Sequence, residues 1–342
     1  MRTLRRNPAT TTAVAMSALL ALAVLAAACS TTPERAGRGA TAAPTTTAST
    51  TTPTTSASTT GARAGAVPAG DVSCTGPLEG PEVRRYDEAP GVRPDLLSMD
   101  VYRRPGATGC PVIVWVHGGG WRVGDKRGNA IDTKVAWAGR LGAVLVSVNY
   151  RLATPDNDVR WPAFGRDVAA AVDRVIDDAA EFGIDPSKVV LVGHSAGAQL
   201  VSIVGTNPTL LGATGRDRTA VRCVVSLDSA AYDLTTGLAD DEDGIYATAF
   251  GQDPATLADA SPTLQARTQP GSMPSFLVVT RGVPRREVIA RDFATAVREA
   301  GGSADVLDAN PYTHEQVNTR LGVPGEQVVT PPVEAFLERC LR

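Results

Sequence analysis

Apolar residues gather in six short runs along the chain, and helix-like patterns lie between most of them. The runs are rich in Val, Ile and Leu, which is typical of parallel strands buried on both faces. The predicted strands cover residues 111–116, 143–148, 188–192, 222–227, 275–280 and 304–308. The predicted helices cover residues 130–140, 163–181, 196–205, 285–300 and 331–341. This alternation predicts an α/β fold with a mostly parallel central sheet and helices on both faces. Residues 81–102 are expected to add an antiparallel edge.

The N-terminal segment has the composition of an export signal. Several arginines precede an apolar run from Ala13 to Ala28, which is short for a membrane span of about 20 residues. Residues 1–28 are therefore predicted to be a secretory signal peptide. Cys29 directly follows small residues, as in a bacterial lipobox, although Ala26 occupies the position where Leu is preferred. We expect Cys29 to be lipidated. The alternatives are an ordinary signal cleaved near Ala28 and an uncleaved anchor.

The next segment, residues 29–75, is dominated by Thr, Ala, Ser, Pro and Gly. Such a segment buries too little apolar surface to offset its chain entropy, so it is predicted to be a disordered, lipid-anchored linker. Residues 76–342 then form one catalytic domain of ordinary size. The predicted location is the outer side of the cell membrane.

The most informative motif is Gly193-His194-Ser195-Ala196-Gly197. It follows the apolar run Val189–Val192 and precedes a helical run of small residues. A strand, a tight turn and a helix form the context in which Gly-x-Ser-x-Gly makes a nucleophile elbow. The pattern predicts that Ser195 is a catalytic nucleophile with an exposed hydroxyl group.

A second motif, His117-Gly118-Gly119-Gly120-Trp121, closes the first predicted buried strand. Acyl transfer turns a carbonyl oxygen into an anion, which backbone N–H groups must already face. Consecutive glycines let the backbone turn its N–H groups toward that oxygen. We expect Gly119, Gly120 and Ala196, the residue after the nucleophile, to form an oxyanion hole. The alternative is an ordinary glycine turn.

The two motifs together resemble those of α/β-hydrolase esterases of the hormone-sensitive-lipase and feruloyl-esterase-like group. Further stretches with counterparts in that group are 147–152, 181–188, 260–262 and 313–314. The resemblance covers about residues 80–342 and implies the α/β-hydrolase fold with a small cap region. It also implies a serine hydrolase that cleaves carboxylic esters.

The general base is found by elimination among three histidines. His117 belongs to the glycine-rich motif and His194 to the elbow, which leaves His314. It follows the last predicted strand, as the chain order Ser, acid, His of α/β-hydrolases requires. The base must accept a proton from Ser195 and later return it to the leaving group.

The acid of the triad is where the sequence departs from the family pattern. The resemblance places it near Gly282, after the strand 275–280, but no carboxylate stands there. Asp228, after the preceding strand, is the first candidate. Glu287 is the second, although a carboxylate in a first helical turn also has an ordinary stabilising role. A third possibility is that no acid is present.

Four cysteines beyond Cys29 indicate two disulfides in an exported chain. Three pairings are possible. We favour Cys74–Cys110, which would attach the N-terminal arm to a strand, and Cys223–Cys340, which would attach a strand to the last helix. The alternative is four buried thiols.

The remaining features narrow the function. A net charge of -3 gives no reason to expect nucleic-acid binding, and no residues have metal-ligand spacing, so no metal or cofactor is expected. The region 231–272 lacks a bulky apolar lid, which favours short acyl esters as small-molecule substrates.

Trp121 and Trp161 are expected to be core residues, with pocket lining as the alternative. The competing function is a non-catalytic envelope lipoprotein with a degenerate triad. The oligomeric state stays open.

Overall fold

The structure is a computed structural model that describes residues 72–128, 130–237 and 244–342 of the 342-residue chain. The predicted signal peptide (1–28), the predicted lipidation site at Cys29 and the predicted linker up to residue 71 lie outside the described residues. Within them, no helix is long and apolar enough to cross a membrane.

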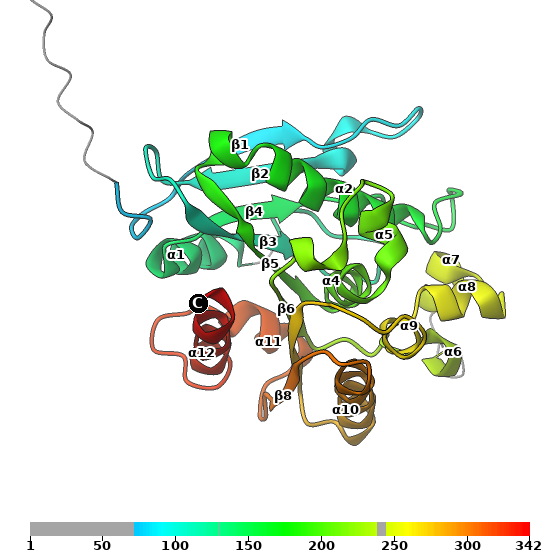
Figure 1. The fold of residues 1–342 in the computed structure, drawn as a ribbon. Coiled ribbons are helices and arrows are strands. Elements are labelled where there is room, and N and C mark those ends of the chain that lie inside the picture. Colours follow the sequence, from blue (N-terminus) through cyan, green and yellow to red (C-terminus); the bar gives the residue numbers. More distant parts are fainter. Residues whose placement is uncertain (1–71, 129, 238–243) are drawn as a thin grey trace, which may run out of the picture. The chain divides into compact units, whose positions relative to one another are not determined.

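An eight-stranded sheet organises the domain, in the strand order β1-β2-β4-β3-β5-β6-β7-β8 (Figure 1). The contacts of β2 with β1 and β4 are antiparallel, and all other neighbours are parallel. Both the mostly parallel sheet and its antiparallel edge are therefore as predicted. The strands are β1 (Glu79–Arg85), β2 (Ser98–Arg103), β3 (Cys110–Val116), β4 (Val144–Val148), β5 (Ile184–His194), β6 (Cys223–Leu227), β7 (Ser275–Thr280) and β8 (Ala304–Asp308).

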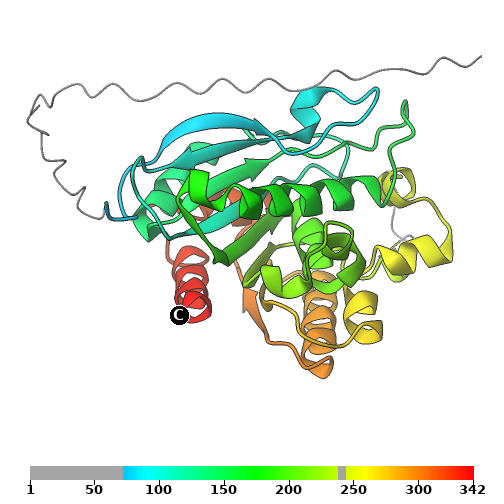
Figure 2. The ribbon, with the colours of Figure 1, turned by 45° about the horizontal axis from the view of Figure 1, so that its top comes forward.

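Successive residues of a strand point to opposite faces, so the sheet has two cores. Along β3, Val112, Val114 and Val116 belong to one core, whereas Ile113 and Trp115 belong to the other. The first core is covered by α2 (Ala163–Asp177), α4 (Ala196–Thr206) and α10 (Pro284–Glu299), and the second by α1 (Ile131–Leu141) and α12 (Thr330–Leu341). Figure 2 shows α12 (red) and α10 (orange) on opposite sides of the sheet.

Most helices begin and end within a residue or two of the prediction. One difference is the predicted helix 163–181, which is divided into α2 and the short α3 (Ala179–Phe182). Asp178 between them has ψ 14, outside the helical range. The other short helices are α5 (Pro208–Gly212), the 3-10 turns η1 (Pro94–Leu97) and η2 (Arg218–Ala220), and α11 (His314–Arg320).

Among the described residues, four short helices lie in the connection from β6 to β7. They are α6 (Leu234–Gly237), α7 (Ile245–Phe250), α8 (Pro254–Asp259) and α9 (Pro262–Thr268). They lie beyond α4, at the side of the sheet that carries α10 (Figure 1). The connection is thus the small cap that was predicted, rather than a long lid.

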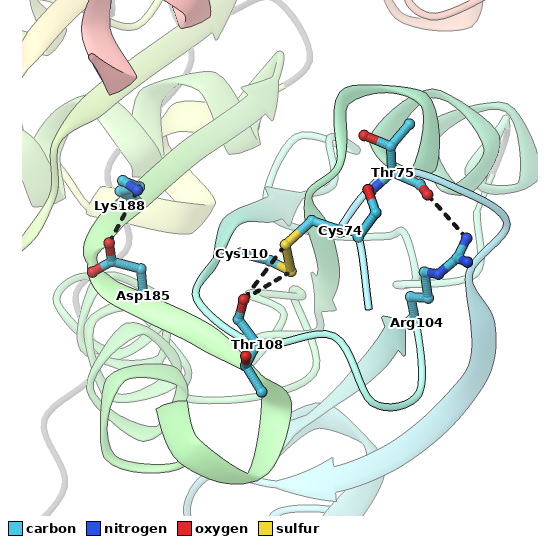
Figure 3. The surroundings of a disulfide bond; sticks show 8 residues. Cys74, Thr75, Arg104, Thr108, Cys110, Asp185 and Lys188 are labelled. Carbon is cyan, nitrogen blue, oxygen red and sulfur yellow. Dashed lines mark hydrogen bonds and ion pairs between the residues drawn. A yellow bond between two sulfur atoms is a disulfide. The ribbon is translucent and has the colours of Figure 1, made fainter. Parts of the chain in front are cut away.

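Two disulfides join distant parts of the chain, in the pairings that the sequence analysis favoured. Cys74 is bonded to Cys110 at the start of β3, with 5.6 Å between the Cα atoms (Figure 3). Cys223, the first residue of β6, is bonded to Cys340 in α12. The arm before β1 is also held by Arg104, whose Nη1 donates to the Thr75 carbonyl at 2.9 Å. Residues 72–75, the end of the predicted linker, are thus attached to the folded domain.

Candidate active site

Ser195 occupies a sharp turn between β5 and α4, as the elbow motif predicts. Its backbone has φ 56 and ψ -115, an unusual conformation for a residue other than glycine. The two flanking glycines are required by space. A Cβ at Gly193 would lie 2.3 Å from the Gly197 carbonyl oxygen, and a Cβ at Gly197 would lie 2.1 Å from the Val116 oxygen. The strand and the helix can therefore meet at Ser195 only because both positions lack side chains.

The glycine-rich loop after β3 passes directly beside the nucleophile. A Cβ at Gly118 would lie 2.9 Å from the His194 carbonyl oxygen and 3.1 Å from the Ser195 Cβ. Gly119 and Gly120 both have positive φ, 114 and 59, and both line the same pocket as Ser195. Across the described residues, their backbone N–H groups have no acceptor in the protein.

Ala196 provides a third N–H group at the elbow. It is the first residue of α4, so its N–H is among those that a helix leaves without an internal acceptor. The three residues predicted to form the oxyanion hole thus all lie around Ser195. Among the described residues, none of their N–H groups donates to a backbone acceptor.

The contacts of His117 stabilise the glycine-rich loop. Its ring stacks on Tyr150 at 4.4 Å between centroids, and the Tyr150 hydroxyl donates to the His117 carbonyl at 3.0 Å. Its Nδ1 lies 2.7 Å from the Gly118 carbonyl oxygen, so Nδ1 carries the proton, because a carbonyl only accepts. Burial lowers the pKa of His117. A neutral, stacked ring fits a supporting role and leaves the base to another histidine.

A buried polar network holds the residues that follow this loop. Sequence reasoning did not identify this network. The Lys126 ammonium lies 2.9 Å from the Asp100 carboxylate, and the Lys126 N–H donates to Asn149 Oδ1 at 2.6 Å. Asn149 also donates to Asp125 at 3.0 Å. Lys126 and Asp100 are buried, and a charge is buried at tolerable cost only when it is paired. This pairing is what holds the pocket wall near Asp125 in place.

His314 is placed at the pocket by the start of α11. Thr313 caps the helix in a capping box with Gln316, so His314 is the first helical residue rather than a loop residue. Its Nδ1 lies 2.6 Å from Oδ2 of Asp228. Nδ1 therefore holds the proton of the neutral ring, which leaves Nε2 as an acceptor. His314 and Ser195 line one pocket.

His194 lies behind His314 and is not available as a base. Its Nε2 donates to the His314 carbonyl at 2.9 Å, and the two rings are 4.5 Å apart. Burial, followed by the charge of His314, lowers the pKa of His194 to about 3. The elbow histidine thus stays neutral and holds the backbone of the residue that carries the candidate base.

Asp228, the first candidate acid, follows directly after β6 and is fully buried. Besides His314, it contacts Arg286, whose Nη1 lies 3.2 Å from Oδ1, and Arg281, whose Nε lies 3.3 Å from Oδ2. Burial alone would raise the pKa of Asp228, but the His314 hydrogen bond and the two arginine charges outweigh it, so the pKa lies below its ordinary value. The carboxylate is ionised at neutral pH.

The structure separates the second candidate, Glu287, from this cluster. Glu287 is in the first turn of α10 and accepts two hydrogen bonds from Arg291, the shorter at 2.6 Å. It has an ordinary i,i+4 ion pair. A side chain at position 282 would have to displace the exposed side chain of Asn310. Gly282 has φ 57, and a Cβ there would lie 1.8 Å from Nδ2 of Asn310.

The pocket itself has a volume of about 320 Å³. Besides the glycines, its lining is largely polar: His117, Asp125, His194, Ser195, His314, Glu315 and Asn318, with Trp115. Trp121 and Trp161 are not part of this lining. Both are buried, and Trp121 packs on Phe250 at 4.8 Å between ring centroids. They are core residues, as expected.

Comparisons with known proteins agree with this geometry. The family described as BD-FAE matches residues 99–228. The carboxylesterase NlhH of Mycobacterium tuberculosis is 32% identical over 250 residues, which span 68% of this chain and 74% of that protein. Esterase LipQ of the same species is 29% identical over 66% of this chain and 55% of its own length.

Solved structures share the fold. The apo form of Thermogutta terrifontis esterase 2 has a TM-score of 0.59 at 22% identity, over 76% of this chain and 93% of that chain. A truncated carbohydrate esterase from gut microbiota also has a TM-score of 0.59, at 17% identity, over 75% of this chain and 95% of that chain. Together with the relatives, these findings establish the identity of the domain: the chain belongs to the carboxylesterases of the α/β-hydrolase fold, and it is a carboxylic-ester hydrolase.

Proposed function

We propose that the protein hydrolyses short-chain carboxylic esters with Ser195 as nucleophile, His314 as general base and Asp228 as the acid that orients it. The observation that carries this proposal is the position of the His314 ring. It is bonded through Nδ1 to a buried carboxylate and lines the pocket that contains the elbow serine. This is the spatial relationship that a Ser-His-Asp triad requires, whatever the strand that supplies the acid.

The geometry supports an acyl-enzyme mechanism. His314 Nε2 takes the proton of the Ser195 hydroxyl as its oxygen attacks the ester carbonyl. The oxyanion of the tetrahedral intermediate is bound by the N–H groups of Gly119, Gly120 and Ala196. His314 then protonates the leaving alcohol, and the acyl-enzyme remains. A water molecule activated by the same histidine releases the acid and regenerates Ser195.

The preference for short acyl groups is supported by the pocket and the cap. A pocket of about 320 Å³ offers limited room to a long acyl chain, and the four short helices described after β6 form no extended cover. Thermogutta terrifontis esterase 2, which shares the fold, is known with propionate and with butyrate bound. These acyl lengths are therefore the first to test.

The competing hypothesis of a degenerate, non-catalytic site arose from the missing carboxylate near Gly282. Asp228 supplies a carboxylate from the neighbouring strand, so this reason no longer applies. Turnover of p-nitrophenyl acetate and butyrate by the full chain, beside Ser195→Ala, tests the proposal. Turnover and fluorophosphonate labelling should both vanish in the variant. Unchanged turnover in Ser195→Ala would refute the assignment of the nucleophile.

We also propose that the protein is an exported lipoprotein, held at the outer side of the cell membrane through Cys29. The support is the basic start, the apolar run and the small residues that precede Cys29 in the sequence. The test is incorporation of labelled palmitate during expression in bacteria. Labelling should occur in the native chain and be absent in Cys29→Ser. Equal labelling of both would refute lipidation at this residue.

A further inference from the structure

Two arginines lie close after β7, the strand after which the family pattern places the acid. Arg281 directly follows β7, and Arg286 lies in the first turn of α10. The acid itself stands one strand away, after β6. In the parallel register Leu227 lies opposite Val279, and the Asp228 N–H donates to the Val279 carbonyl at 2.8 Å. The segment after β7 thus places two guanidinium groups beside the carboxylate that follows β6.

Both arginines form ion pairs with the acid; Arg286 also donates a hydrogen bond to it, whereas Nε of Arg281 does not. Nη1 of Arg286 is 3.2 Å from Oδ1 of Asp228, and Nε of Arg281 is 3.3 Å from Oδ2, the oxygen that His314 also contacts. The Asp228 side chain has no exposed surface, whereas the arginine side chains are 21% and 28% exposed. The carboxylate can therefore rotate only by giving up a charged partner.

Arg286 also fixes the backbone of the acid. Asp228 has φ 53, in the left-handed region that residues with a side chain seldom adopt. The same Nη1 that reaches Oδ1 donates to the Asp228 carbonyl at 3.0 Å. One guanidinium nitrogen thus holds the backbone and the side chain of Asp228 together. This combination stabilises the single orientation in which Oδ2 faces His314.

We propose that Arg281 and Arg286 are positioning residues of this esterase, which keep Asp228 directed at His314. The proposal rests on the triad put forward above. Loss of either arginine should let the carboxylate turn away from His314, so the chemical step should suffer more than substrate binding.

The test compares Arg286→Gln and Arg281→Gln with Arg291→Gln, a control on α10 whose only described partner is Glu287. We expect each of the first two to lower kcat for p-nitrophenyl acetate by about 10- to 100-fold with little change in KM. Arg286→Lys should restore only part of kcat, because lysine keeps the charge without the guanidinium geometry. The control should behave as the native chain.

Folding is checked by thermal unfolding of each variant, and Arg281→Gln and Arg286→Lys serve if Arg286→Gln does not fold. Folded arginine variants with native kcat would overturn the proposal. Asp228→Asn separates this outcome from a failure of the triad. If Asp228→Asn is inactive while the arginine variants are unaffected, only the positioning role is wrong. If Asp228→Asn is fully active, the triad is wrong and the positioning role falls with it.

Discussion

The carboxylate of Asp228 lies 2.6 Å from Nδ1 of His314, although 86 residues separate them along the chain. The sheet also places the residue before the acid against the nucleophile. The Ser195 N–H donates to the carbonyl of Leu227, the residue just before Asp228, at 2.9 Å. Nucleophile and acid thus leave the sheet side by side, from the adjacent strands β5 and β6. α11 then supplies His314 to the same pocket.

The first prediction concerns the acid. Asp228→Asn should lower kcat for p-nitrophenyl butyrate by roughly 10,000-fold, because an amide no longer fixes the tautomer and charge of His314. Glu287→Gln is the matched control, since Glu287 only pairs with Arg291 on the surface of α10, and should stay within about twofold. Steady-state kinetics of the two proteins decide the matter. A large loss in Glu287→Gln with a small one in Asp228→Asn would reverse the assignment.

The acid also shows where sequence reasoning reaches its limit. The strands, the elbow and the glycine loop follow local rules, because periodicity and glycine spacing determine them. The identity of the acid depends instead on contacts between segments that are far apart in the sequence. Asn310 fills the volume that a side chain at position 282 would need, and no local pattern reveals that contact.

Buried lysines were missed for a related reason. Lys134 and Lys126 are buried, whereas lysine is ordinarily a surface residue. Their partners are a helix carbonyl and the carboxylate of Asp100, from segments 184 and 26 residues away. A single sequence carries no signal of such pairing. The hydrophobic pattern predicted the sheet and the elbow well, but not the polar contacts that hold the pocket in shape.

The second prediction concerns the oxyanion loop. A Cβ at Gly119 would lie 2.0 Å from the Val123 carbonyl oxygen, and the backbone has φ 114. Gly119→Ala must therefore move the loop, and we expect a loss of kcat of more than about 100-fold, as for removal of an oxyanion donor. Gly91→Ala is the control, because Gly91 also has positive φ, 75, but nothing lies within 4 Å of its Cβ.

The control should unfold at lower denaturant, with a cost of about 1 kcal/mol, and keep native kcat. Urea unfolding and p-nitrophenyl acetate turnover measure the two effects separately. Native activity in Gly119→Ala would show that the loop tolerates displacement. In that case its N–H groups could not be the oxyanion donors.

The third prediction concerns Lys134 and pH. Lys134 is fully buried, with Nζ 2.7 Å from the Asn318 carbonyl oxygen, and burial lowers its pKa from 10.5 to about 7. Between these two values the unfolded chain binds one more proton than the folded chain. The free energy of unfolding therefore rises with pH across this window, by up to about 1.4 kcal/mol per pH unit. At pH 7 and below, the buried ammonium costs most.

Lys134→Met removes the ionisable group and keeps most of the volume. Relative to the native chain, the variant should be most stable near pH 6, and its advantage should shrink toward pH 10. Urea unfolding at several pH values measures this difference. Lys188→Met is the control, since Lys188 is 39% exposed and pairs with Asp185, so it reports the loss of a surface lysine. A pH-independent difference for Lys134→Met would contradict the lowered pKa.

The fourth prediction ranks the two disulfides. The bond Cys74–Cys110 closes a loop with a sequence separation of 36, whereas Cys223–Cys340 spans 117. If restriction of the unfolded chain dominates, removing the first should cost about 4 kcal/mol and removing the second about 5 kcal/mol. Urea unfolding of Cys74→Ala/Cys110→Ala and of Cys223→Ala/Cys340→Ala measures the order. The native chain unfolded in excess reductant is the control, and should be less stable than either double variant. A larger loss from the shorter loop would mean that contacts of the N-terminal arm, rather than chain entropy, determine the contribution of that bond.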